Sequence, residues 1–254
     1  MIKCTSVFLC ILALLPFSCQ AIKLSFPDSA AVSNQAHWSE VNAHIETMNT
    51  TPDQITHVSL NQRNLRVIPS WVFEKTRHIT RLSITGTNIK EVPEKISSLP
   101  NLEHLAVPQN KIKTVHPNIV QLTKLKVLNL NDNALSVLPT FLFRIPSLKM
   151  LKLARNQLHS LQGIPGDQAV TNLQRLTLAK NNLHDLPQNI DRLSALEHLD
   201  LSQNAFVLLP QNIAKLKAHL HILDLRDNPL GAKDEGDAIG RTTLQRLFGD
   251  KLRL

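Results

Sequence analysis

The chain has 254 residues, with 28 lysines and arginines against 20 aspartates and glutamates, and a formal net charge of +8. It contains no tyrosine, eight phenylalanines, two tryptophans and three cysteines. A nucleic-acid-binding protein usually presents stacking aromatics beside its basic groups. The sequence shows no such arrangement, which argues against nucleic acid as a partner.

The first 21 residues have the pattern of an export signal. Lys3 provides positive charge, residues 7–16 form an apolar run, and the segment Cys19–Ala21 places small residues where a signal peptidase reads them. The run is shorter than the roughly 20 residues that cross a bilayer, and we predict no transmembrane segment later in the chain. We therefore expect an exported protein, periplasmic or secreted. A lipoprotein anchored through Cys19 is the alternative, and Pro16 fits its signal poorly.

All three cysteines, Cys4, Cys10 and Cys19, lie within this predicted signal. Cleavage after Ala21 would leave a chain without disulfides, a thiol nucleophile or thiolate metal ligands. Loss of Lys3 from the 28 basic side chains leaves 27 against 20 acidic ones, a net charge of about +7. This charge favours acidic partners weakly, through the rate of association.

Residues 22–54 form a segment that precedes a series of repeats. Within it, Trp38, Val41, Ile45 and Met48 follow helical spacing. The spacing predicts an amphipathic helix over about 34–48 that caps the first repeat.

Residues 55–230 contain one pattern eight times, with starts 23 to 25 residues apart. It reads L-x-x-L-x-L-x-x-N-x-L-x-x-L-P-x-x-I-x-x-L, and no copy can bury its apolar face alone, so the copies must stack. Leucines at period two, such as Leu128 and Leu130, predict one short strand per copy. The Leu138-Pro139 half of the pattern predicts 3-10 turns or short helices. We therefore predict an α/β solenoid, a right-handed coil with a curved parallel sheet on its concave face and the short helices on its convex face.

An asparagine at the ninth position of the pattern predicts a structural ladder. Each amide can satisfy backbone N–H and C=O groups that are buried inside a turn. The first two repeats have Arg63 and Thr87 at this position and are looser copies. The predicted ladder consists of Asn110, Asn133, Asn156, Asn181, Asn204 and Asn228.

The fifth repeat and the C-terminal segment depart from the pattern. The fifth repeat carries residues 162–167 in place of the Leu-Pro step. We interpret this loop as a tolerated insertion, and a second contact or a bend in the coil is the alternative.

Residues 231–254 form a cap that is too short for a second domain. Within it, we expect a loop over 231–240 and a helix over 241–248 with Leu244, Leu247 and Phe248 against the last repeat.

The repeats resemble the typical 23-residue leucine-rich repeats that carry L-P-x-x-I-x-x-L in their outer half. That form occurs in Ras-group leucine-rich-repeat proteins and in many bacterial proteins, including secreted effectors of intracellular pathogens. The resemblance covers about 55–230, and the segment Ile239–Asp250 resembles the C-terminal cap of bacterial members. It implies a leucine-rich-repeat solenoid that binds proteins, usually on its concave face, and it does not select one activity.

The candidate contact surface follows from the strand pattern, because the residues between the leucines face the concave side. Repeats five and six form a basic patch beside two apolar side chains, whereas repeats seven and eight carry Asp200, Asp224 and Asp227. Apolar area bordered by charge is typical of a binding site, and ordinary solvated faces are the alternative. The predicted partner-binding residues are Val127, Met150, Lys152, Arg155, Arg175, Lys180 and His198.

The sequence contains no recognisable catalytic motif, so we predict no catalytic residue, no cofactor and no metal site. His159 and His184 occupy matching positions in adjacent repeats, but they lack the carboxylate or thiol that a good metal site would add. Relatives with a ubiquitin-ligase domain carry a catalytic cysteine and a longer chain, which this sequence does not have.

Two hypotheses of function remain. The first is an exported, non-catalytic, monomeric interaction module that binds a partner protein on its concave face, an effector acting on a host protein if the source is a pathogen. The second is an envelope or surface protein that binds a polysaccharide or anionic lipid through the basic patch. Rising salt should weaken the second kind of binding more steeply than the first.

Overall fold

The computed structural model describes residues 22–26, 55–61, 65–161, 164 and 172–254. The predicted export signal, the predicted capping helix over 34–48 and most of the loop in the fifth repeat lie outside the described residues. Within the described part, no helix is long and apolar enough to cross a membrane.

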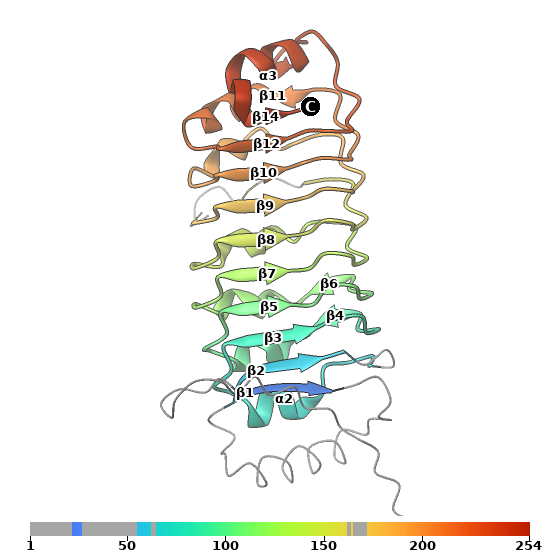
Figure 1. Ribbon diagram of the computed structural model, residues 1–254, viewed down its shortest axis with the longest axis vertical. Helices are drawn as coiled ribbons and strands as arrows, with labels where there is room; N and C mark the ends of the chain where they lie inside the picture. The colour runs from blue at the N-terminus through green and yellow to red at the C-terminus, as the bar shows by residue number, and fades with distance from the viewer. Residues whose placement is uncertain (1–21, 27–54, 62–64, 162–163, 165–171) are drawn as a thin grey trace, which may run out of the picture.

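One parallel sheet runs the length of the molecule, with its strands stacked in chain order (Figure 1). Each repeat contributes one strand because its alternating leucines are buried on one side. This confirms the predicted solenoid. The repeat strands are β2 (Ile55–Leu60), β3 (Arg81–Ile84), β5 (His104–Ala106), β7 (Val127–Asn129), β8 (Met150–Lys152), β9 (Arg175–Thr177), β10 (His198–Asp200) and β12 (Ile222–Asp224).

The sheet has ten strands rather than the eight that the repeats predict. Strand β1 (Ile22–Phe26) pairs with β2, and β14 (Leu252–Arg253) pairs with β12, both in parallel. An end strand without a neighbour would leave a row of N–H and C=O groups unpaired. The two added strands supply those partners at both ends of the repeat array.

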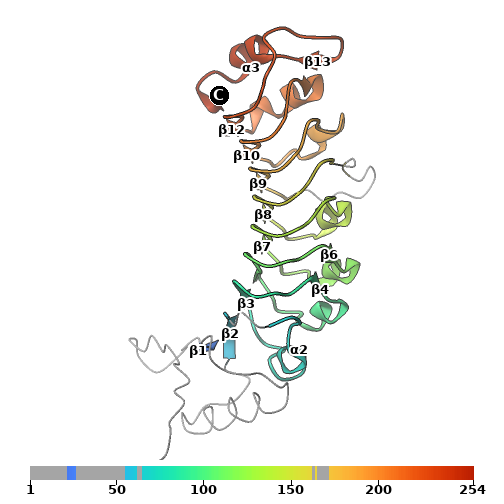
Figure 2. The same cartoon turned by 90° about the vertical axis from the view of Figure 1, so that its right-hand side faces the viewer.

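The short helices lie on the convex side, opposite the sheet (Figure 2). A proline lies at or next to the start of most of them, where its missing N–H breaks no helical hydrogen bond. This confirms the predicted 3-10 turns and short helices. They are α2 (Ser70–Lys75), η2 (Glu94–Ser98), η3 (Pro117–Gln121), η4 (Thr140–Arg144), η5 (Ile190–Arg192) and η6 (Gln211–Ala218).

A continuous apolar core fills the space between the sheet and the convex helices. The repeat leucines are almost wholly buried, as at Leu128, Leu151 and Leu199. In the fifth repeat, Ile164 is buried, and its backbone N–H donates to the side-chain oxygen of Asn189 at 3.1 Å. This loop residue therefore joins the core although the Leu-Pro step is missing.

Two small sheets lie outside the main one. Strands β4 (Glu91–Val92) and β6 (Thr114–Val115) pair in parallel beyond the carboxyl ends of the main strands (Figure 1). Strand β11 (Leu209–Pro210) pairs antiparallel with β13 (Ala238–Ile239). The loop expected over 231–240 therefore contains a short strand, because its backbone pairs with the convex side of the seventh repeat.

The C-terminal helix α3 (Arg241–Phe248) has the predicted bounds, and Leu244 and Phe248 are buried. Its start is held by Asp234, which accepts hydrogen bonds from the Gly240 N–H and from the Thr243 hydroxyl, both at 2.8 Å. Gly240 has no room for a side chain, because a Cβ there would lie 2.5 Å from a backbone oxygen. Two further elements, η7 (Gly249–Lys251) and β14, connect this helix to the sheet.

Candidate protein-binding surface

The strand register arranges the concave side chains in two rows. Neighbouring strands pair residue for residue, so equivalent positions of successive repeats lie beside each other. Side chains alternate along a strand, and the buried leucine between them fixes the other two on the concave face. The first row is His57, Arg81, His104, Val127, Met150, Arg175, His198 and Ile222. The second is Ser59, Ser83, Ala106, Asn129, Lys152, Thr177, Asp200, Asp224 and Arg253.

The centre of the first row is apolar and has a histidine and an arginine on each side. Val127 and Met150 are adjacent and half-buried. His104 lies next to Val127, and Arg175 lies next to Met150. The apolar pair is therefore accessible to a partner and bordered by groups that carry or can acquire positive charge.

Two of the three histidines in this row, His104 and His198, have lowered pKa values. Burial lowers the pKa of His104, and the neighbouring Arg81 lowers it further. Burial also lowers the pKa of His198, and Arg175 is the next cause. The rings of His198 and His221 meet edge to face, with their centroids 6.1 Å apart. In the free protein this environment favours the neutral imidazoles.

The four predicted cations differ in how they are held. Arg155 makes an ion pair with Asp132, with Nη1 and Oδ1 3.3 Å apart. Within the described part of the chain, the side chains of Lys152, Arg175 and Lys180 make no hydrogen bond or ion pair. These three positive charges are therefore available for a partner, whereas that of Arg155 is shared.

Arg155 and Lys180 project from turns with left-handed backbone. The residue before each ladder asparagine has φ between 54° and 58°, a region that residues other than glycine seldom adopt. This conformation was not predicted from the repeat pattern. It repeats along the edge of the concave face at Gln109, Asp132, Arg155, Lys180, Gln203 and Asp227.

An open hollow of about 550 Å³ lies beside the centre of the two rows. Lys126, Lys149 and Gln174, each immediately before a main-sheet strand, contribute to its lining. Lys126 is held by Glu103, with Nζ and Oε2 2.8 Å apart. The side chain of Lys149 makes no hydrogen bond or ion pair with any described residue. The hollow therefore adds concave shape and one more free positive charge next to Met150.

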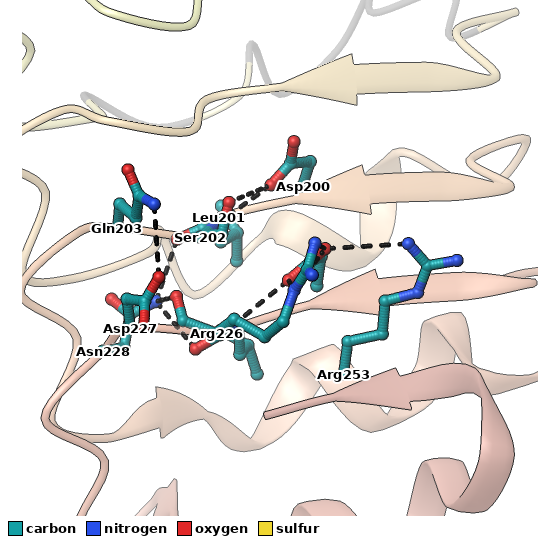
Figure 3. A network of polar contacts seen from close by, with 10 residues as sticks. Asp200, Leu201, Ser202, Gln203, Arg226, Asp227, Asn228 and Arg253 are labelled. Carbon is teal, nitrogen blue, oxygen red and sulfur yellow. Dashed lines mark hydrogen bonds and ion pairs between the residues drawn. The ribbon is translucent and has the colours of Figure 1, made fainter.

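The acidic end of the face has a different character, because its carboxylates are bound internally (Figure 3). Asp224 is 4% exposed and accepts hydrogen bonds from the Arg226 guanidinium at 2.6 to 3.2 Å. Arg253 of β14 lies 3.9 Å from the same carboxylate. Burial raises the pKa of Asp224, but the bonds from Arg226 outweigh it and hold the pKa below its usual value.

The other two acidic groups are also engaged. Asp200 accepts hydrogen bonds from the Ser202 backbone N–H at 3.1 Å and from its hydroxyl at 2.7 Å. Asp227 accepts one from the Gln203 side chain at 3.2 Å. Arg226 was not predicted, although its position two residues after Asp224 was a usable signal. Arg253 was not predicted either, because nothing in the repeat pattern places that residue on the face.

The ladder asparagines connect neighbouring repeats. In Asn156, the side-chain oxygen accepts from the Leu135 N–H at 3.1 Å, and the side-chain nitrogen donates to the carbonyls of Leu130 and Leu153. The other asparagines make equivalent bonds, except that Asn110 accepts from the Thr87 hydroxyl. Thr87, at the ninth position of the second repeat, is therefore bonded to the first asparagine of the ladder, and the later asparagines bond each repeat to the backbone of the one before.

The described residues contain no group of three or more histidine, cysteine, aspartate or glutamate side chains that could hold a metal ion. His184 lies 3.5 Å from Asp185, and His159 makes no such contact with any described residue. The concave face of the described chain offers charge, shape and apolar area.

Comparison with known proteins supports this architecture. Two family models match, both described as leucine-rich repeat, at residues 100–158 and 195–216. None of the curated proteins compared with this chain matches it. Among solved structures, the chain is similar to an internalin (InlF) from Listeria monocytogenes, with 17% identity and a TM-score of 0.53. The similarity covers 70% of this chain and 63% of the internalin chain, and at 17% identity it concerns the fold alone. Repeat pattern, stacked parallel sheet and family models agree, and the chain is a leucine-rich repeat protein.

Proposed function

We propose that this protein is an exported, non-catalytic module that binds a partner protein on its concave face. Leucine-rich repeats commonly mediate protein–protein interaction. The observation that carries the proposal is the pair Val127 and Met150, which is accessible and bordered by cations that have no partner among the described residues. The proposed contact residues are Val127, Met150, Lys152, Arg155, Arg175, Lys180 and His198.

The partner should present an apolar anchor with carboxylates around it. Interfaces commonly combine an apolar centre with a polar rim, and a few central side chains provide most of the binding energy. Met150 suits such a centre because its flexible thioether adapts to the shape of a partner. Lys152 lies two residues after Met150 on the same strand, in the second row. Arg175 lies beside Met150 on the next strand. An acidic partner would gain both contacts without breaking an ion pair of the free protein.

Export rests on residues 1–21, and delivery to a host cell is a further step of the same proposal. Fusion of the signal to a reporter enzyme, followed by fractionation of the source cells, tests export directly. A reporter that stays in the cytoplasm would contradict this part of the proposal and leave the binding surface untouched.

Charge reversal tests the binding surface. The double variant Lys152→Glu/Arg175→Glu should capture the partner at least about tenfold less, because two attractive contacts become repulsive. Its melting temperature should change little, since neither side chain makes a hydrogen bond or an ion pair with a described residue. Capture from lysate of the relevant cells, quantified by mass spectrometry against the unaltered protein, would identify the partner and measure the loss.

The matched control is Lys95→Glu/Lys217→Glu, which changes the net charge equally on the convex helices η2 and η6. The control should retain the same captured protein. The concave face is not the binding surface if the folded Lys152→Glu/Arg175→Glu variant still captures the partner protein. The same conclusion follows if the control variant loses the partner equally.

A further inference from the structure

A second cationic surface lies on the flank of the coil, away from the concave face. Lys90 and Lys113 immediately precede β4 and β6, the small sheet beyond the carboxyl ends of β3 and β5 (Figure 1). The Lys113 N–H donates to the Lys90 carbonyl at 2.9 Å, so the two lysines stack repeat on repeat. Arg66 holds the equivalent position in the first repeat. All three side chains are exposed.

Lys111 adds a fourth exposed charge to this flank, and its N–H bonds to the Ile89 carbonyl of the preceding repeat at 3.0 Å. Within the described part of the chain, the four side chains make no hydrogen bond or ion pair. The acidic residue nearest in sequence is Glu91, which makes no ion pair with a described residue either. We name the four residues Arg66, Lys90, Lys111 and Lys113 the flank strip.

Two other exposed lysines are each paired with an acidic residue of the preceding repeat. Lys126 binds Glu103 at 2.8 Å, and Lys215 binds Asp191 at 3.0 Å. In both pairs, neighbouring repeats place opposite charges at adjacent positions. The flank strip does the reverse, because neighbouring repeats place like charges at equivalent positions. Stacked like charges repel each other, and an external anion would relieve that repulsion.

We propose that the flank strip binds a linear polysaccharide that carries sulfate or phosphate groups, with the chain running along the axis of the coil. Successive repeats are about 4.8 Å apart, so Arg66, Lys90 and Lys113 form a single row of positive charges with a fixed spacing, and Lys111 lies two residues before Lys113. A row of this kind matches a polymer with regularly spaced anions. The same column continues with Ser136 and His159, which are polar and exposed, so the polymer would meet no opposing charge there.

Two other polyanions fit the strip less well. Single-stranded nucleic acid is usually held by aromatic side chains that stack on its bases, and the flank positions of the described repeats contain none. A membrane surface would favour an apolar band beside the cations. The exposed Val67 and Val137 on this flank are separated by Glu91 and Thr114, which occupy the same column. A polymer recognised by its charges alone requires neither feature.

The test uses the full exported chain and a heparin-derived dodecasaccharide as the sulfated probe. The double variant Lys90→Glu/Lys113→Glu should bind this probe about tenfold more weakly, since two attractive contacts become repulsive. The control is Lys152→Glu/Arg175→Glu, which has the same net charge but keeps the flank strip, and it should bind the probe as the unaltered protein does. Affinities are measured by isothermal titration calorimetry, and circular dichroism verifies folding.

Equal weakening in both variants would mean that the probe responds to net charge, and would overturn the proposal. Tighter binding of the unaltered protein to vesicles with anionic lipid, or to an oligodeoxynucleotide of matched charge, would overturn the choice of polysaccharide. The concave variant separates this inference from the proposed function, because it should lose the protein partner and retain the sulfated probe.

Discussion

Two halves of the concave face differ in whether their charged side chains are bound by neighbouring groups of the same chain. In repeats five and six, Lys152, Arg175 and Lys180 make no contact that neutralises them within the described chain. In repeats seven and eight, Asp224 is buried under Arg226, and Asp200 is bound to Ser202. In the amino-acid sequence both halves appear as charged columns. In the structure, the charges of one half have no partner among the described residues, whereas the carboxylates of the other half are bound by neighbouring groups.

The difference shows that a charge in a repeat column is not necessarily a charge offered to a partner. Asp224 is followed by β14 at the end of the sheet, and Arg253 of that strand approaches its carboxylate. An end of a solenoid must satisfy the groups that another repeat would otherwise cover. Lys152 lies in the middle of the array, where neighbouring repeats already satisfy the backbone. It can therefore serve binding at little cost in stability.

The largest expected effect is on stability at the acidic end. Asp224→Ala should lower the free energy of unfolding by about 1–3 kcal/mol, because the buried carboxylate accepts from both the backbone and the side chain of Arg226. Lys152→Ala should change it by less than about 0.5 kcal/mol. Urea denaturation of both variants measures the two values. Equal losses of unfolding free energy in the two variants would show that the two halves of the concave face do not differ in their contribution to stability.

The stability that comes from Asp224 should also depend on pH. Its pKa in the folded protein is lowered, so the contribution is present above the unfolded pKa of about 3.9 and is lost as the pH falls through the folded value. The difference between the unaltered protein and Asp224→Ala should therefore shrink in acid. Denaturation at a series of acidic pH values measures it, and a constant difference would show that ionisation of Asp224 is not involved.

The next effect concerns the two cations on left-handed turns. Lys180→Ala should weaken partner binding by about three- to tenfold, whereas Arg155→Ala should weaken it less, because Arg155 is already paired with Asp132. Surface plasmon resonance with the captured partner compares the two. A larger effect at Arg155 would show that the ion pair presents its guanidinium to the partner instead of neutralising it.

Acidity should strengthen partner binding by a few-fold while weakening the free protein slightly. His104 and His198 have lowered pKa values, so stability is lost as the pH falls below their unfolded value of about 6.5. Carboxylates of a partner would raise the same pKa values, and affinity should therefore increase between about pH 7.5 and about pH 5.5.

Burial is the largest cause of both lowered pKa values, and the charges that face the two histidines modify it. Arg81 and Lys126 oppose protonation of His104, and Glu103 favours it. Arg175, His221 and Arg253 oppose protonation of His198, and Glu197 favours it. The variant His104→Gln/His198→Gln should lose the pH dependence in calorimetric titrations with the partner. A pH dependence that survives in this variant must come from other groups.

The smallest expected effect is at the last strand. Arg253→Ala should lower the free energy of unfolding by less than about 0.5 kcal/mol, because its guanidinium is half exposed and 3.9 Å from the Asp224 carboxylate. Thermal denaturation is the measurement. A loss as large as that of Asp224→Ala would mean that β14 depends on this ion pair for its place in the sheet.

The periodic part of the molecule was predictable from sequence to a high degree. The spacing of the leucines fixed the strands, the concave rows and the convex helices, since a period of two selects one face of a strand. The C-terminal helix followed from Leu244 and Phe248 in the same way. Strand β1 was missed, although Ile22, Leu24 and Phe26 alternate with polar residues. Five residues without a neighbouring copy of the pattern gave too weak a signal.

The sequence by itself determined that this chain is a stacked coil, because every repeat carries the apolar positions and the asparagine that its neighbours need. It also determined which residues occupy each column of the concave face. Only the tertiary structure decided which of those charges are free. Asp224 meets Arg226 across a turn and Arg253 across a strand, whereas Lys152 makes no hydrogen bond or ion pair with a described residue. Such side-chain contacts depend on how turns and strands are placed in the folded coil.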